Sequence, residues 1–344
     1  MPCFRFANFT TNMNQSKIKL ALIAGGYSGE YVISIKTAIT IENNIDKDKY
    51  DVYKIIISKD NWLHRTPQGD NIEVDKKDFS LNIGGEKIVF DTAFIAVHGT
   101  PGEDGKLQGY LEMLDIPFTS CGAIVSGLTF NKIFCNRVIA QSGLVHVAKS
   151  LHVVANQGMG VKEILEQVTL PVFVKPAEGG SSLATTKVKR PEDLQAALNA
   201  VYDFEPQAMV EEFVKGREFS IGVYRAKNEV VALPVTEIIS SKEFFDYEAK
   251  YTDGVSKEIT PAEVEKEMSE LMAQTAQKIY QVLNCRGICR VDFILEASSN
   301  HLYFLEINTI PGQSENSIVP QQVRATGMSL QDFYGLLIEE SLKH

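Results

Sequence analysis

Two stretches of the sequence largely decide the predicted fold and function of this chain. They are Ile288-Cys-Arg-Val-Asp-Phe-Ile-Leu295 and Leu302-Tyr-Phe-Leu-Glu-Ile-Asn308. Polar and apolar residues alternate in both stretches, which is typical of strands that bury one face. A turn-like segment, residues 297–300, separates them. The pattern predicts an antiparallel hairpin with one apolar face and one face that carries charged and amide side chains.

The polar face of this hairpin brings like charges together. If the hairpin folds symmetrically about Ser299, Asp292 faces Glu306 and Arg290 faces Asn308. Carboxylates directly opposite each other destabilise a sheet, so the pair favours a bound cation. Hard oxygen ligands suit Mg²⁺, which shares its shell with phosphate oxygens, so the site implies a nucleoside triphosphate. The alternative is a solvated outer face with scattered charges.

The composition indicates a soluble globular protein of two or three domains. The chain has 344 residues, of which 44% are hydrophobic and 23% charged. A net charge of -10 argues against a nucleic-acid binder, because such proteins carry a basic stripe. No apolar run approaches the roughly 18 residues that a membrane span needs. We see no secretory signal, and we expect residues 1–16 to be a disordered extension.

The five cysteines are too few and too scattered to form a disulfide framework. Cys285 and Cys289 look like a candidate pair on paper only, because no second Cys or His pair sits at zinc-site spacing. We therefore expect buried free thiols, a reducing compartment and a cytoplasmic protein.

Strands alternate with helices in the first third of the chain. Residues 18–24, 52–57, 92–97 and 116–119 read as strands, and helices are expected from about Ser34 and over 107–114. This order predicts a doubly wound parallel sheet for residues 17–120.

Two further segments follow. Residues 121–211 hold strands at 171–175 and 185–188 and a helix that begins at Pro191. Residues 212–344 are expected to hold mostly antiparallel strands, a long helix over about 261–283, the hairpin and a C-terminal helix.

Other candidate residues lie at the ends of predicted strands. Lys175 precedes a Gly-Gly-Ser-Ser turn, where backbone N–H groups can approach phosphate oxygens, although an ordinary turn is also open. Lys132 follows Asn131 at an expected helix start. It is either a second lysine that binds phosphate or an ordinary surface lysine. Glu211 and Glu218 could accept hydrogen bonds from an adenine amino group and from ribose hydroxyls. The alternative is that they belong to a charged loop.

Two candidates lie at the carboxyl ends of N-terminal strands, where open α/β sheets bind ligands. Glu30 could hold an ammonium group and His98 a carboxylate, although a lone loop histidine has no function in most proteins. Residues 244–254 mix aromatic and charged residues and are expected to form an ordered loop that acts as a lid, or simply a strand.

Together these residues resemble the ATP-grasp superfamily and, within it, the D-alanine–D-alanine ligase family. The resemblance covers residues 17–344. Four stretches carry it: Gly25–Glu30, His98–Gly109, the ω-loop Asp246–Tyr251 and the metal loop Glu306–Gly312. It implies a three-domain ATP-grasp architecture, with an N-terminal α/β substrate domain (17–120) and central (121–211) and C-terminal (212–344) α+β domains that clamp ATP.

The resemblance also implies a role for each site residue. Lys132 and Lys175 would bind phosphates, Lys250 would reach the γ-phosphate, and Glu211, Val214 and Glu218 would bind adenosine. Asp292, Glu306 and Asn308 would hold two Mg²⁺ or Mn²⁺. Glu30, with His98 nearby, would bind the ammonium of the first D-alanine, and Ser317 the carboxylate of the second. Glu30, Ser181 and Tyr251 would form a triad that closes the ω-loop, and Arg290 with the Gly312 N–H would stabilise an oxyanion.

The implied activity is ATP-dependent ligation of two D-alanine molecules through an acyl phosphate, giving ADP and phosphate, for peptidoglycan precursors of the cell wall. The implied partners are ATP and D-alanine, with no nucleic acid or membrane, and the implied assembly is a homodimer. Three alternatives stay open: a ligase that joins D-alanine to D-lactate or D-serine, an ATP-grasp ligase for another carboxylate–amine pair, and an inactive nucleotide-binding protein. Ala184 and Tyr31-Val-Ile-Ser34 depart from the usual motifs.

Overall fold

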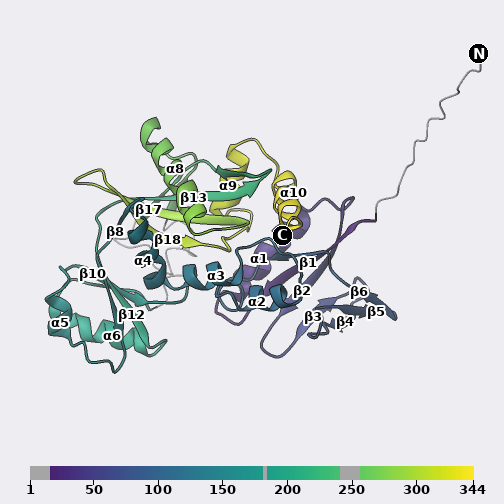
Figure 1. The fold of residues 1–344 in the computed structure, drawn as a ribbon, viewed down its shortest axis with the longest axis horizontal. Helices are drawn as coiled ribbons and strands as arrows, with labels where there is room; N and C mark the ends of the chain where they lie inside the picture. The colour runs from purple at the N-terminus through teal and green to yellow at the C-terminus, as the bar shows by residue number, and fades with distance from the viewer. Residues whose placement is uncertain (1–15, 181–183, 241–255) are drawn as a thin grey trace, which may run out of the picture.

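The computed structural model describes residues 16–180, 184–240 and 256–344. Three larger sheets lie along the long axis of the molecule (Figure 1). The sheet that contains β10 and β12 lies at one end, the sheet of β1 to β4 at the other, and β13, β17 and β18 between them. Within the described ranges no helix is long and apolar enough to cross a membrane. The expected disordered extension falls almost entirely on residues 1–15, outside the described part.

The N-terminal sheet has the strand order β4-β3-β2-β1-β7 in the described residues. Its strands are β1 (Ile18–Gly25), β2 (Tyr50–Ile57), β3 (Trp62–Arg65), β4 (Asn71–Glu73) and β7 (Thr92–Ile95). The predicted parallel arrangement is present in β2-β1-β7, whereas β3 and β4 extend the sheet antiparallel. The hairpin of β5 (Leu81–Ile83) and β6 (Glu86–Ile88) packs nearby.

Two helices complete this part of the molecule. Helix α1 spans Tyr31–Asn43, so it begins three residues before the predicted Ser34, and α2 spans Lys106–Met113. The expected strand at 116–119 forms only a single bridge, between Ala93 and Phe118. Because β1 and β7 are parallel neighbours, the loops that follow them meet at one edge of the sheet.

The central sheet is antiparallel in the order β11-β10-β12-β9. Its elements are β9 (Ser150–Val154), α5 (Val161–Leu165), β10 (Val172–Pro176), β11 (Thr186–Val188), the 3₁₀ turn η1 (Pro191–Asp193), α6 (Leu194–Tyr202) and β12 (Gln207–Glu212). Helix α6 packs Leu194, Ala197, Leu198 and Val201 against Val172, Val174, Ala208 and Val210. Since side chains alternate along a strand, Lys175 and Glu211 lie on the opposite face of this sheet.

The C-terminal sheet has the order β16-β15-β13-β17-β18-β8, with β14 also paired to β13. Its strands are β8 (His146–Val147), β13 (Gly216–Ala226), β14 (Glu229–Ala232), β15 (Thr236–Ser240), β16 (Ser256–Ile259), β17 (Ile288–Glu296) and β18 (Leu302–Asn308). The accompanying helices are α3 (Ala123–Phe130), α4 (Lys132–Ser142), α8 (Lys266–Val282) and α9 (Ile318–Ala325). Helix α8 thus begins five residues after the predicted Pro261.

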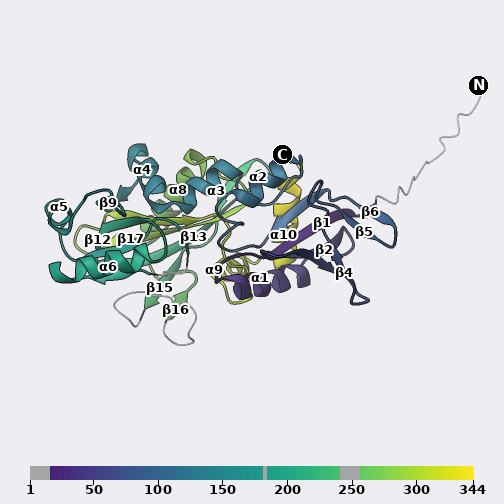
Figure 2. The ribbon, with the colours of Figure 1, turned by 90° about the horizontal axis from the view of Figure 1, so that it is seen from below.

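One face of this sheet is the apolar face that the sequence predicts. Cys289, Val291, Phe293 and Leu295 of β17 join one core cluster with residues of α4 and α8. Figure 2 shows α4 and α8 on the same side of β13 and β17. The opposite face is therefore the one that carries Arg290 and Asp292.

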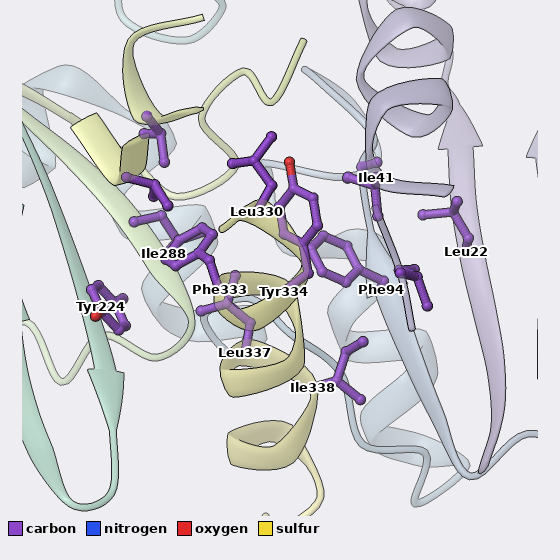
Figure 3. Close-up of a cluster of buried hydrophobic side chains, with 14 of the residues drawn as sticks. Leu22, Ile41, Phe94, Tyr224, Ile288, Leu330, Phe333, Tyr334, Leu337 and Ile338 are labelled. Atoms are coloured by element: carbon purple, nitrogen blue, oxygen red, sulfur yellow. The ribbon is translucent and has the colours of Figure 1, made fainter. Parts of the chain in front are cut away.

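The C-terminal helix, α10 (Leu330–Ser341), joins the N-terminal sheet to the C-terminal sheet. Phe333, Tyr334 and Leu337 are buried between Leu22 and Phe94 on one side and Tyr224 and Ile288 on the other (Figure 3). Near the end of the helix, the hydroxyls of Ser341 and Thr92 are 2.8 Å apart. This shared core holds the loops of the N-terminal sheet in a fixed position against β17 and β18.

Candidate active site

The hairpin of β17 and β18 carries the two residue pairs that the sequence predicts. Asp292 is registered with Glu306, and Arg290 with Asn308. The hairpin is not symmetric about Ser299, however, because Phe293 is registered with Phe304, which leaves Leu305 as an extra residue. Such a bulge shifts the alternation by one residue, and it keeps Glu306 on the same face as Asp292.

The carboxylate of Asp292 is held by hydrogen bonds from Arg290 and Ser220. Arg290 donates from Nη2 to Oδ2 at 2.7 Å and from Nε to Oδ1 at 3.0 Å. The Ser220 hydroxyl of β13 donates to Oδ1 at 2.6 Å. Asp292 is 3% exposed, so these contacts fix its orientation in a site largely shielded from water.

Ser220 is a residue that sequence reasoning missed. It is registered directly across from Asp292, but that register depends on how β13 pairs with β17 and has no local signal. Gln322 of α9 supports this part of β13, because its Nε2 donates to the Ser220 carbonyl at 2.9 Å and its Oε1 accepts from Gly222 N at 2.9 Å.

Arg290 is surrounded by acidic side chains. Burial alone would lower the pKa of its guanidinium, but Asp292, Glu306 and Glu103 outweigh burial and raise that pKa above its usual range. Arg290 therefore stays a cation beside the pair of carboxylates. A fixed cation at this place can neutralise negative charge that develops on a bound substrate.

The donor set on the polar face of the hairpin suits hard divalent cations. Asp292 and Glu306 supply carboxylate oxygens at opposite register positions, and Asn308 supplies an amide. The Asn308 Oδ1 accepts from Ile310 N at 2.8 Å, which ties the start of the following loop to the end of β18. Oxygen donors from two carboxylates and an amide are the set that Mg²⁺ takes in proteins, so the residues present fit such an ion.

The loop after β18 docks on the N-terminal sheet. His98 donates from Nδ1 to the Ile310 carbonyl at 3.0 Å, and its Nε2 lies 3.0 Å from the Thr37 hydroxyl of α1. Gln313 N donates to the same hydroxyl at 3.4 Å. Both ring nitrogens of His98 are thus engaged in holding this loop, and the predicted substrate-binding histidine is also a structural link between domains.

Glu30 lies where the glycine loops of two domains approach each other. It is the N-cap residue of α1 and follows the loop after β1. A Cβ added to Gly99, in the loop after β7, or to Gly180, in the loop after β10, would lie 3.1 Å from its carboxylate oxygens. The two loops therefore bracket the carboxylate, and glycine is the residue that permits this close approach.

Glu103 is a second residue that sequence reasoning did not single out. Its Oε1 lies 3.8 Å from His98 Nδ1, and the side chain is buried. Burial, with the nearby charge of Glu30, raises the pKa of Glu103, against the opposing effect of His98. Glu103 belongs to the stretch His98–Gly109 that carries the family resemblance, so the sequence did place it at this edge.

Lys175 and Glu211 form a buried pair on the central sheet. Lys175 Nζ donates to Glu211 Oε2 at 2.7 Å, and Asn136 of α4 donates to Glu211 Oε1 at 3.2 Å. The carboxylate predicted to bind adenosine is therefore bonded to a lysine predicted to bind phosphate. Asn136 was not predicted.

Lys132 lies at the first position of α4, where the Asn131 side chain caps the helix by accepting from Phe134 N. Its ammonium donates to the carbonyl of Gly179, which places it at the predicted phosphate loop. Val214 lies in the connection between β12 and β13, and Glu218 lies in β13 opposite Ile294. Both are half-buried.

Gly312 and Ser317 are brought close together by the loop before α9. A Cβ on Gly312 would lie 3.0 Å from the Ser317 hydroxyl, which is itself 2.7 Å from the Ser314 hydroxyl. Three predicted site residues, Ser181, Lys250 and Tyr251, fall outside the described residues.

Comparisons with known proteins point to one family. A family model described as "D-ala D-ala ligase C-terminus" matches residues 138–339, and one described as "D-ala D-ala ligase N-terminus" matches residues 19–121. Among curated proteins, a D-alanine--D-alanine ligase from Parabacteroides distasonis is 42% identical over 328 residues, covering 95% of this chain and 98% of that protein. The ligase of the same name from Flavobacterium johnsoniae is 42% identical over 323 residues, covering 94% and 99%.

Solved structures show the same fold. The VanG D-Ala:D-Ser ligase from Enterococcus faecalis superposes with a TM-score of 0.85 at 31% identity, covering 95% of this chain and 100% of that one. The D-alanyl-alanine synthetase A from Vibrio cholerae superposes with a TM-score of 0.84 at 26% identity, covering 95% and 99%.

Proposed function

We propose roles for individual residues in a chain that belongs to the D-alanine–D-alanine ligase family and joins two D-alanine molecules in an ATP-dependent reaction. The observation that carries the proposal is the hairpin in which Asp292 faces Glu306 beside the half-buried Arg290. Its charges match what the reaction needs: acids that hold cations, and a cation that receives developing negative charge.

The first step activates a carboxylate. The carboxylate of a free amino acid is a poor electrophile, and phosphorylation by ATP converts it to an acyl phosphate with ADP as the other product. We propose that two lysines bind the phosphates. Lys132 of α4 contacts the loop after β10, and Lys175 lies near the end of β10. Binding the phosphates would require Lys175 to share its charge between Glu211 and the nucleotide. Glu211, Val214 and Glu218 are proposed to bind adenosine.

Asp292, Glu306 and Asn308 are proposed to hold two Mg²⁺ or Mn²⁺ ions, and their oxygen donors support this. When bound, such ions supply charge neutralisation around the transferring phosphoryl group. The protein's own contribution is orientation. Ser220 and Arg290 fix the carboxylate of Asp292, and the Asn308 side chain fixes the turn that leads to Ile310.

The second step forms the peptide bond. The amine of the second D-alanine attacks the acyl phosphate, and phosphate leaves from a tetrahedral oxyanion. Arg290 and the Gly312 N–H are proposed to stabilise that oxyanion, since preorganised donors act most strongly in a site shielded from water. Ser317 is proposed to bind the carboxylate of the second D-alanine, next to Gly312.

The remaining assignments concern the first D-alanine and closure of the site. Glu30, with His98 nearby, is proposed to bind the ammonium of the first D-alanine. Ser181, Tyr251 and Glu30 are proposed to close the ω-loop, and Lys250 to reach the γ-phosphate. A closed site protects the acyl phosphate from hydrolysis.

A ligase for D-serine or D-lactate is the second candidate, because the VanG D-Ala:D-Ser ligase is among the similar structures. We favour D-alanine as the second substrate. The test is a competition assay at neutral pH in which radiolabelled D-alanine is mixed with equal D-serine or D-lactate and the products are separated. D-alanyl-D-alanine should dominate in both mixtures. A dominant mixed dipeptide or depsipeptide would overturn the assignment.

Three coarser features complete the proposal. We propose domain boundaries near residues 120 and 211, supported by the N-terminal sheet, which ends before the first, and by the central sheet of β9 to β12, which ends near the second. Strand β8, which lies between the two boundaries in sequence, pairs with β18 of the C-terminal sheet. The free, buried thiols of the described cysteines support a reducing, cytoplasmic environment. A homodimer stays a prediction, which light scattering coupled to size-exclusion chromatography would test.

A further inference from the structure

Three cysteines from distant parts of the sequence meet in the core beneath β17. Cys121 lies just before α3, Cys285 follows α8, and Cys289 is in β17. Their sulfur atoms all lie within 4.8 Å of one another, and all three residues are buried. The Sγ atoms of Cys121 and Cys289 are 3.5 Å apart. None of the three has a role in the reaction described above.

The backbone around the cluster holds the sulfur atoms in place. Gly287 has a φ of 62°, and a Cβ there would lie 1.8 Å from the carbonyl oxygen of Thr119, so only glycine allows these two segments to run so close together. The Arg286 N–H donates to Cys121 Sγ at 3.4 Å. The positions of the sulfur atoms are thus set by the close approach of two backbone segments, and not only by packing among apolar side chains.

The thiols act as a group. Burial would raise the pKa of the Cys121 thiol, but hydrogen bonds from Cys285 and Cys289 outweigh burial and lower it, while the pKa values of those two thiols are raised. A metal cation can replace the protons of clustered thiols, because a thiol that binds a metal releases its proton.

We propose that Cys121, Cys285 and Cys289 form a three-thiolate binding site for one soft d¹⁰ metal ion of the class to which Cu(I) and Zn(II) belong. Thiolates select such ions over hard ions such as Mg²⁺. The spacing of Cys285 and Cys289, with three residues between them, lies within the range seen in zinc sites. In the described residues the group has three members. That number favours Cu(I), since structural Zn(II) takes four ligands.

The site is separate from the proposed Mg²⁺ site. Cys289 belongs to the core face of β17, whereas Asp292 belongs to the opposite face. A small pocket lined by Thr119, Arg286 and Gly287 lies beside the turn that precedes Cys289, and no cysteine lines it. The inference does not depend on the proposed function, because no residue of one site belongs to the other.

The test uses the full, reduced, metal-free chain with Cys3→Ser as the background, since Cys3 lies outside the described residues. Cu(I) and Zn(II) are titrated separately against a chromophoric chelator, and native mass spectrometry gives the stoichiometry. We expect one ion per chain, and an affinity that falls by roughly 10-fold or more in Cys121→Ser and Cys289→Ser. Cys135→Ser is the matched control, because Cys135 is buried in the same core but lies outside the group, and it should bind as the background does.

A second measurement does not need the variants to fold. The background protein is alkylated slowly under native conditions, with and without one equivalent of metal, and each cysteine peptide is quantified. Metal should slow the alkylation of the three cysteines and leave Cys135 unchanged. Binding of neither metal, binding that survives in Cys121→Ser and Cys289→Ser, or equal protection of Cys135 would each overturn the proposal. Retained D-alanine-dependent ADP release in the variants shows that they are folded.

Discussion

Asp292 lies directly opposite Glu306 across the β17–β18 hairpin, and a single extra residue, Leu305, makes this possible. Between the bulge and the turn the two strands pair in a register shifted by one residue. Without the bulge, Glu306 would turn toward the apolar core under α4 and α8. One inserted residue thus converts an ordinary hairpin into one whose polar face carries two facing carboxylates.

Arg290→Lys should lower kcat by on the order of 100-fold. Lysine keeps a positive charge beside Asp292, so the variant should fold. Lysine lacks the planar guanidinium group, whose several N–H donors can bind Asp292 and an oxyanion at the same time. Steady-state kinetics of ADP release measures this. Arg217→Lys is the matched control, because the exposed Arg217 makes a similar two-pronged contact with Glu237. A kcat for Arg290→Lys equal to that of the control would show that Arg290 does not act on the oxyanion.

Ser220→Ala should raise the Mg²⁺ concentration needed for half-maximal activity by roughly 10- to 100-fold. The hydroxyl holds Asp292 Oδ1 at 2.6 Å, and its loss frees the carboxylate to rotate. Activity measured against Mg²⁺ concentration tests this. Ser341→Ala removes a buried hydroxyl that bonds Thr92 instead, so it controls for a loss of stability alone. An unchanged Mg²⁺ dependence in Ser220→Ala would rule out this role.

The site residues differ in how far the sequence could predict them. Asp292 and Glu306 belong to one short hairpin, and a turn assumed to be centred on Ser299 paired them correctly, whereas the observed pairing depends on the bulge at Leu305. Ser220 and Asn136 reach the site from β13 and α4, and their positions depend on contacts between segments about 72 and 75 residues apart in sequence. The Leu305 bulge left no signal of its own, because the apolar residues on both sides of it continue to look like one strand.

Leu337→Ala should destabilise the protein by about 2–5 kcal/mol. Leu337 is 1% exposed and lies in the core that α10 forms between the two sheets. Chemical denaturation measures the change in the free energy of unfolding. Leu342→Ala, at the exposed end of the same helix, should change stability by only about 0.5 kcal/mol or less. Similar losses in both variants would contradict the burial of α10 as the link between the sheets.

Glu103→Gln should stabilise the protein relative to wild type at neutral pH but not in acid. The pKa of Glu103 is raised in the fold, chiefly by burial, above its ordinary value of 4.5. A raised carboxyl pKa contributes stability that is present below the unfolded-state pKa and is lost as pH rises through the folded-state pKa. The Tm difference between variant and wild type should therefore grow with pH over that window.

Thermal unfolding between acid and neutral pH measures this difference. Glu73→Gln, at an exposed position of β4, accounts for the removal of one charge from the whole molecule. A Tm advantage of Glu103→Gln that is constant with pH, or that shrinks as pH rises, would contradict the raised pKa of Glu103.

The fold was predictable where a local pattern decides it. The strand at 18–24 and the helix at 107–114 appear within about a residue of their predicted positions. The segment 116–119 has strand-like composition, but only Phe118 is registered with a neighbouring strand, because extension along a sheet depends on partners that are distant in sequence. Helix α8 begins at Lys266 and not at about Pro261, where it was predicted to begin. Proline fits the first turn of a helix, and this favoured the earlier start.

The most direct test of the ligase account is ADP release by wild type and by Glu306→Gln, each with and without D-alanine. Glu296→Gln, in the same strand as Asp292 but at the turn end of the hairpin, is the matched control. The account predicts that wild type and Glu296→Gln release ADP only when D-alanine is present, and that Glu306→Gln lowers this rate by roughly 100-fold or more. ADP release by wild type that is indifferent to D-alanine, or a Glu306→Gln rate equal to that of wild type, would contradict it.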